Sequence, residues 1–172
     1  MPRYLSLVLI GLLGAVSASL PACGSDEQGT ALQHSASVIA TPAGAADQLD
    51  VSLTAAQRDR ATDILTQQVA FNRQTYSALQ QAGLTPDTLV TLDFTYVAPD
   101  RKAASALGSF LEDNDCLNVK VAASSNGHFE VTGHSQPTTV TLDLLDKWVT
   151  WMVVQGVVRE CEFDGWGTLV PW

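Results

Sequence analysis

The histidines are the first side chains that could bind a metal or move a proton. His128 and His134 lie six residues apart around one expected strand, a spacing that puts both on the same face. Two residues make no complete metal site, because zinc takes three or four protein ligands. We therefore expect both histidines to be exposed to solvent or held by hydrogen bonds, and we expect no metal and no cofactor.

Four aspartates could supply the paired carboxylates that general acid–base catalysis uses: Asp93, Asp113, Asp115 and Asp164. No histidine or nucleophilic serine stands in a recognisable relation to them, and the sequence has no P-loop, GxGxxG, HExxH or CxxC pattern. Helix capping and solvation are the favoured roles for these carboxylates. The sequence thus predicts a non-enzymatic protein, and a small hydrolase with carboxylates in a cleft is the alternative.

One cysteine has a predicted chemistry of its own. Arg3 precedes an apolar run from Tyr4 to about Val16, and small residues follow. The run is shorter than the ~20 apolar residues that span a bilayer, but it has the length of a signal-peptide core. Leu20-Pro21-Ala22-Cys23 resembles a bacterial lipobox, in which the cysteine receives lipid and becomes the mature N-terminus. We predict a signal peptide over residues 1–22 and a lipid anchor on Cys23; a plain signal peptide cut near Ala18 is the alternative.

Composition divides the remainder of the chain. Residues 24 to about 50 are rich in Gly, Ala, Ser, Thr and Asp without a sustained period, so residues 23–51 are predicted to form a flexible tether. Residues 52–172 form the expected folded domain, and the chain as a whole is 46% hydrophobic, which is enough for a packed core. The net charge of −9 argues against nucleic-acid binding, which needs a basic patch. A basic protein surface is the more natural partner.

Apolar spacing predicts the elements of this domain. A helix is expected from the cap Thr54 to Gly83, because apolar residues recur there at helical spacing. Leu92, Phe94 and Tyr96 alternate with polar residues and predict a strand with one wet face. The expected elements after it are a helix capped by Asp100, strands over 116–123 and 128–134, a helix over 141–161 and a strand over 162–170.

This order of elements predicts an α+β, ferredoxin-like βαββαβ fold preceded by an N-terminal helix. Consecutive split βαβ units build a four-stranded antiparallel sheet in the order 4-1-3-2, with both later helices on one face. The last strand then lies at an edge, beside the first.

The stretch EFDGWGT in the last strand places Trp166 between Gly165 and Gly167. Phe163, Trp166 and Leu169 are spaced three and three, which breaks the strand period of two. A β-bulge at Gly165 or Gly167 would restore the phase and re-aim Trp166. We expect Trp166 to be buried against the last helix. Core packing is favoured over a sugar- or peptide-binding platform for three tryptophans: Trp148, Trp151 and Trp166.

The ending Asp164-Gly165-Trp166-Gly167-Thr168, after a helix rich in Trp and small residues, resembles the ending of the regulator of ribonuclease activity B (RraB) family, inhibitors of ribonuclease E. The stretch AGLTPDTLVTLDFTYVA is also similar to that family's helix, turn and first strand, so the likeness covers about residues 54–172. The resemblance implies the fold given above and a non-enzymatic domain that binds a protein. The five residues of the ending are then structural or partner-binding.

This chain departs from that family in its signal-like N-terminus and tether, and in a less acidic first strand and hairpin. The leader would place the domain on the periplasmic or cell-surface side of a membrane, away from ribonuclease E. We therefore expect an unidentified protein partner in the cell envelope. A cytoplasmic-type inhibitor of ribonuclease E and a structural or scaffold lipoprotein of the envelope are the alternatives.

Cys116 and Cys161 are expected not to form a disulfide, although export favours such bonds. The proposed topology puts them at opposite edges and opposite ends of the sheet. Three strand spacings of ~4.8 Å and a strand length of roughly 17 Å would separate them. A disulfide needs Cα atoms within about 7 Å.

We predict that Cys23 carries lipid. In cells fed a clickable fatty acid, the wild-type protein should be labelled and the Cys23→Ser variant should not, because the serine hydroxyl is not an acceptor for the lipid. Equal labelling of the two proteins, or labelling of neither, would contradict this prediction.

Overall fold

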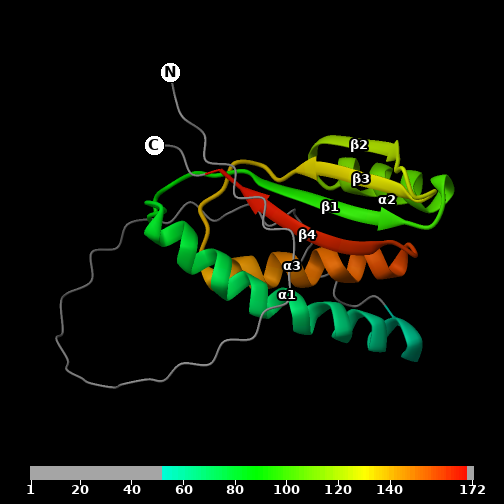
Figure 1. The fold of residues 1–172 in the computed structure, drawn as a ribbon, viewed down its shortest axis with the longest axis horizontal. Helices are drawn as coiled ribbons and strands as arrows, with labels where there is room; N and C mark the ends of the chain where they lie inside the picture. Colours follow the sequence, from blue (N-terminus) through cyan, green and yellow to red (C-terminus); the bar gives the residue numbers. More distant parts are fainter. Residues whose placement is uncertain (1–51, 170–172) are drawn as a thin grey trace.

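A computed structural model of the protein describes residues 52–169. The predicted signal peptide, Cys23 and the tether lie outside the described residues, as do residues 170–172 of the predicted domain. The elements in chain order are α1 (Ala55–Gln81), β1 (Leu92–Ala98), α2 (Arg101–Asp113), β2 (Leu117–Ala123), β3 (Phe129–His134), α3 (Leu142–Val158) and β4 (Glu162–Thr168) (Figure 1).

The four strands form one antiparallel sheet in the order β2-β3-β1-β4. This is the predicted order counted from the other edge, and it confirms the α+β, ferredoxin-like prediction. Helix α2 lies behind β2 and β3, and α3 runs along the β4 side of the sheet beside α1 (Figure 1). No helix within residues 52–169 is both long enough and apolar enough to cross a membrane.

Side-chain caps begin the three helices. Thr54 accepts a hydrogen bond from the backbone of Gln57, whose side chain accepts one from Thr54 N in return. Such a capping box satisfies two backbone donors that the first turn leaves free. Asp100 caps α2 by accepting from Ala103 N at 2.8 Å, and Thr141 caps α3. The caps predicted at Thr54 and Asp100 are confirmed.

The core lies between the sheet and the helices α2 and α3. Along β1 the buried residues alternate with half-buried ones, as the sequence predicts. Tyr96 is fully buried and donates a hydrogen bond to the carbonyl of Met152 in α3 at 2.9 Å. Burial raises the pKa of Tyr96 well above its usual value, so the phenol stays neutral. A Cβ at Gly156 would lie 2.8 Å from the Tyr96 ring, so this close helix–sheet approach requires glycine.

A β-bulge in β4 confirms the predicted change of phase. Phe163 pairs with Tyr96 and Gly165 pairs with Thr95, so Asp164 is the extra residue. The bulge keeps Phe163 and Trp166 on the core side, where 2% and 7% of their surfaces are exposed. Gly165 has a φ of 152°, a conformation that side chains disfavour.

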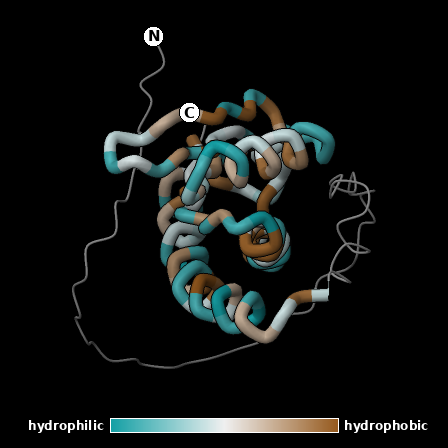
Figure 2. Tube along the Cα trace, turned by 90° about the vertical axis from the view of Figure 1, so that its right-hand side faces the viewer, coloured by the Kyte–Doolittle hydropathy of each residue, from teal (hydrophilic) through white to brown (hydrophobic). Residues whose placement is uncertain are grey.

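The two edges of the sheet are protected in different ways. Helix α1, which is largely hydrophilic (Figure 2), packs beside the edge strand β4. Strand β2 forms the other edge, and its register with β3 shifts between Leu117 and Lys120. Within that irregular stretch Asn118 has a φ of 52°. Bulges and lysines are common protections of edge strands.

Helices α2 and α3 end in the same way, although the sequence shows no repeat. Asp115 and Glu160 each have a φ of 62°. The amide of the following cysteine then donates to a carbonyl five residues earlier, at 3.0 Å for Cys116 and 2.9 Å for Cys161. Both cysteines are free, as predicted. Burial raises the pKa of Cys116 to about 12 and that of Cys161 to about 11.

We predict that Gly165→Val destabilises the domain by ~1–3 kcal/mol, because valine at this φ stores backbone strain. Gly167→Val is the matched control: Gly167 has no positive φ, and no atom lies within 4 Å of a Cβ built there. Its midpoint of urea unfolding should equal or slightly exceed that of the wild type, since valine suits a strand. Equal midpoints for the two variants would show that the bulge does not require glycine.

Candidate functional site

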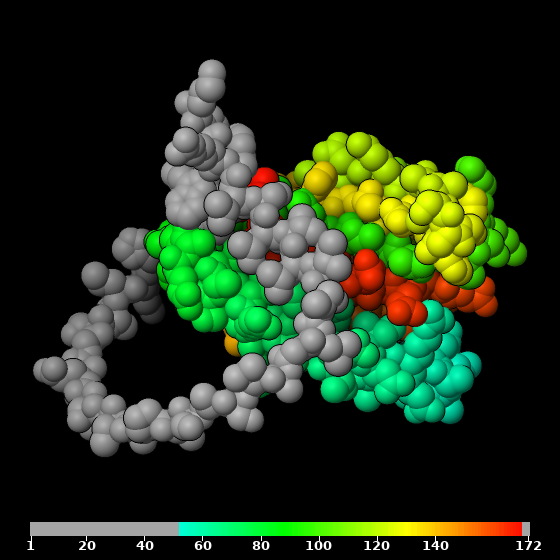
Figure 3. Space-filling model, viewed as in Figure 1, coloured from blue at the N-terminus to red at the C-terminus, as the bar shows by residue number. Residues whose placement is uncertain are grey.

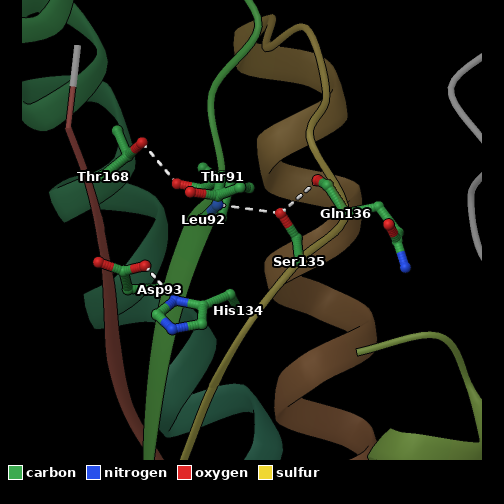
Figure 4. A network of polar contacts seen from close by, with 7 residues as sticks. All are labelled: Thr91, Leu92, Asp93, His134, Ser135, Gln136 and Thr168. Carbon is green, nitrogen blue, oxygen red and sulfur yellow. Dashed lines mark hydrogen bonds and ion pairs between the residues drawn. The ribbon is translucent and has the colours of Figure 1, made fainter. Parts of the chain in front are cut away.

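The five residues of the motif Asp164-Gly165-Trp166-Gly167-Thr168 lie in β4, some in the core and others at the surface. Trp166 and Thr168 are buried, whereas Asp164 is exposed and the two glycines are half-buried. Thr168 Oγ1 donates to the carbonyl of Thr91 at 2.6 Å and thereby fixes the end of β4 beside β1 (Figure 4). The inward residues therefore hold the sheet together, and the outward ones remain accessible.

Trp166 is the anchor of the N-terminal helix. Its indole Nε1 donates to Asn72 Oδ1 at 2.7 Å, and Asn72 Nδ2 donates to Asp146 Oδ1 at 2.8 Å. Phe71 meets the Trp166 ring edge-on, with 6.2 Å between the ring centroids. Trp166 is buried as expected, and both its hydrogen bond and its edge-on ring contact are with α1.

Sequence reasoning missed Asn72, which is completely buried. A signal was present, because Asn72 continues the spacing of the apolar stripe that contains Leu65, Val69 and Tyr76. A polar residue on such a stripe needs a hydrogen-bond partner once it is buried. The partner could not be read from the stripe, since both partners come from other elements.

A groove of about 270 Å³ runs between the first half of α1 and the start of β4, and carboxylates dominate its charge. In Figure 3 the atoms of β4 lie directly beside those of the first turns of α1. The lining residues are Arg60, Asp63, Ile64, Gln67, Gln68, Glu162, Phe163 and Asp164. Arg60 Nη2 bridges the groove to Glu162 Oε2 at 3.1 Å, and both side chains are about half exposed.

Of the four aspartates considered as acid–base candidates, only Asp164 lines this groove, where it meets Asp63 and Glu162. Asp113 and Asp115 are exposed at the end of α2. Sequence reasoning did not single out Asp63 or Glu162, because neither belongs to a pattern with chemical meaning. Within residues 52–169, no group of three His, Cys, Asp or Glu side chains is placed to hold a metal ion.

Among residues 52–169, one aspartate–histidine pair is present, and it lies on the face of the sheet opposite α2 and α3. His134 Nδ1 is 2.5 Å from Asp93 Oδ1, and the two side chains are 42% and 50% exposed. Ser135 points elsewhere: its hydroxyl accepts from Leu92 N at 2.9 Å and donates to the Gln136 carbonyl at 2.8 Å (Figure 4). His128 is exposed in the hairpin turn. The histidines are thus exposed or hydrogen-bonded, as expected, and Ser135 has a structural role.

No protein-family model matches the chain, and no curated protein matches it either. The resemblance to the RraB family therefore stays a prediction from the sequence.

We predict that Asn72→Ala destabilises the domain by about 1–3 kcal/mol, because it leaves Trp166 Nε1 and Asp146 without their partner. Gln74→Ala, on the exposed side of the same helix, should shift the free energy of unfolding by about 0.5 kcal/mol or less. Trp166→Phe removes the same bond from the other side. The double variant should therefore cost less than the sum of the two single variants, and strict additivity in urea unfolding would contradict the proposed coupling.

Proposed function

We propose that this protein is a non-enzymatic protein-binding domain of the RraB type, displayed in the cell envelope through a lipid anchor on Cys23. We further propose that its partner is a protein other than ribonuclease E. The leader sequence supports the location, since Arg3, the apolar run and Cys23 together direct the domain out of the cytoplasm.

Within residues 52–169 one face of the sheet has no helix packed on it, and this uncovered face is the observation that most favours protein binding. Helices α2 and α3 cover one face, and α1 covers the β4 edge. On the opposite face the side chains of Asp93, Thr95, Thr132 and His134 stand side by side and partly exposed, in the register of β1 and β3. Non-obligate protein interfaces are about as polar as the rest of a protein surface, so a mixed polar face of this kind is compatible with one.

Charge indicates the kind of partner. The chain carries a net charge of −9, so a basic protein surface is attracted over a distance of about one Debye length, ~8 Å at physiological salt. Association should therefore weaken as salt is added. Glu162 pairs with Val97 and so lies on the same uncovered face, at its β4 margin. The uncovered face is thus continuous with the acidic groove.

A photocrosslinking amino acid at Thr95 or Thr132 tests the use of this face in living cells. Both positions should give the same discrete protein adduct, and the adduct should fade when spheroplasts are washed with high salt. Ser105, which is exposed on α2, is the control position, and a crosslinking residue there should give no adduct. The same adducts from Ser105, or no adduct from Thr95 and Thr132, would contradict binding through this face.

We predict that external protease digests the tagged protein in cells whose outer membrane is permeabilised. Purified protein should leave RNA cleavage by full-length ribonuclease E unchanged at micromolar concentration. A protected protein that also slows this cleavage would instead identify a cytoplasmic inhibitor of ribonuclease E.

A further inference from the structure

We propose that Asn126 is a site of spontaneous chemical modification, at which the backbone nitrogen of Gly127 attacks the Asn126 side chain and converts it to aspartate and isoaspartate. The sequence contains one Asn-Gly pair, and the structure places it in the turn that joins β2 to β3. The inference does not depend on the partner or on the location proposed above.

The reaction closes and then opens a five-membered ring. Gly127 N loses its proton and forms a bond to Asn126 Cγ, while the bond from Cγ to Nδ2 breaks and ammonia leaves with that proton. Water then opens the resulting succinimide at one of its two carbonyls. Opening at Cγ leaves aspartate in a normal backbone, whereas opening at the main-chain carbonyl leaves isoaspartate, whose backbone runs through Cβ. Both steps balance with water as the one co-reactant.

The hairpin turn leaves both reacting groups open to solvent. Asn126, Gly127 and His128 are all exposed, and within the described part of the chain no atom lies within 4 Å of a Cβ built on Gly127. Gly127 has a φ of 86°, the left-handed conformation that a tight hairpin turn asks of glycine. The turn therefore requires the residue that also gives the attacking nitrogen the least steric hindrance.

Two long hydrogen bonds oppose ring closure. Gly127 N donates to the Ser124 carbonyl at 3.3 Å, and Asn126 Oδ1 accepts from His128 N at 3.3 Å. Both distances exceed about 3.2 Å, the upper end of the usual range for such bonds. An exposed turn held in this way opens at little cost in free energy, and the side chain of Asn126 can then rotate toward Gly127 N without disturbing the core.

The other asparagines of the chain are better protected. Asn72 is completely buried, and Asn114 Nδ2 donates to the Phe110 carbonyl in a shorter bond of 2.8 Å. Asn118 is followed by Val119, whose β-branched side chain crowds the nitrogen that would attack. The structure thus favours Asn126 as the first asparagine to react.

Asp164-Gly165 is the one Asp-Gly pair of the sequence, and it could form the same ring with loss of water. It lies inside β4, where Gly165 pairs with Thr95 and the adjacent Trp166 is bonded in the core. The backbone rotation that ring closure requires would break this strand. The two pairs share a reactive glycine, but the fold exposes the first pair and restrains the second.

Isoaspartate should loosen the hairpin between β2 and β3. It adds one carbon to the main chain of a turn in which Ser124 N donates to the His128 carbonyl at 2.9 Å and Gly127 N donates to Ser124. The longer turn no longer fits these bonds. Strand β2 lies at the edge of the sheet and pairs with β3, so the effect should stay in the hairpin.

Peptide mapping of the purified full-length protein in detergent tests the proposal. After incubation at mildly alkaline pH, Asn126 should convert at least about tenfold faster than Asn114 or Asn118, which takes a barrier difference of only ~1.4 kcal/mol. Isoaspartyl methyltransferase should then label the peptide that contains residue 126. Asn126→Gln should abolish this label, because glutamine would have to form a six-membered ring. Equal rates for the three asparagines, or an unchanged label in the variant, would overturn the proposal.

The same incubation in urea tests the contribution of the fold. Asp164 should form isoaspartate only when the protein is unfolded, whereas Asn126 should convert in the folded protein as well. If folded protein keeps Asn126 intact for as long as it keeps Asp164, the turn protects the pair and the proposal is wrong.

Amide hydrogen exchange measures the structural consequence. Ser124 and Gly127 should exchange faster in the converted protein than in fresh protein, and the amides of β1 should be unchanged. Asn126→Asp is the matched control, since it adds the same charge with a normal backbone, and it should exchange like fresh wild-type protein. Equal exchange in fresh and converted protein would contradict the loosening of the hairpin.

Discussion

The buried carboxamide of Asn72 is the constraint on which the arrangement of α1 depends. It accepts from Trp166 and donates to Asp146, so that β4, α1 and α3 meet at one side chain. A fully satisfied polar group in a core specifies a single packing, because any shift of the helix would leave buried donors and acceptors unpaired. With α1 set in this way, Arg60 lies opposite Glu162 and the groove between the helix and the strand acquires its two walls.

The motif strand places both Phe163 and Trp166 in the core, although the two residues are three positions apart. An unbroken alternation cannot do this, because residues three apart point to opposite faces of a strand. The extra residue at Asp164 resolves the conflict, and Gly165 supplies the backbone conformation that the extra residue demands. Gly167, on the other side of Trp166, does not need such a conformation. The two glycines that flank Trp166 therefore have different structural roles.

The sequence predicts those parts of the fold that depend on local chemistry. Caps such as Thr54 and Asp100, the alternation of β1 and the phase change in β4 are all readable because each involves neighbours along the chain. The neighbour of Trp166 was not predictable in this way: it depends on where α1 packs, and that is settled by a bond between residues 94 positions apart. The groove escaped prediction for the same reason, since its walls come from opposite ends of the domain. Asp63 and Glu162 became candidate site residues only because the fold brings them together in one groove.

The irregular edge of β2 has a consequence for crowding. Proteins held on a membrane meet one another in two dimensions, at a local concentration far above that in solution, and an exposed straight strand would invite them to join into a continuous sheet. The left-handed Asn118 and the register shift beside it interrupt the row of backbone donors and acceptors that such joining needs. Under the membrane anchoring proposed above, this edge would let neighbouring domains lie close together without pairing through β2.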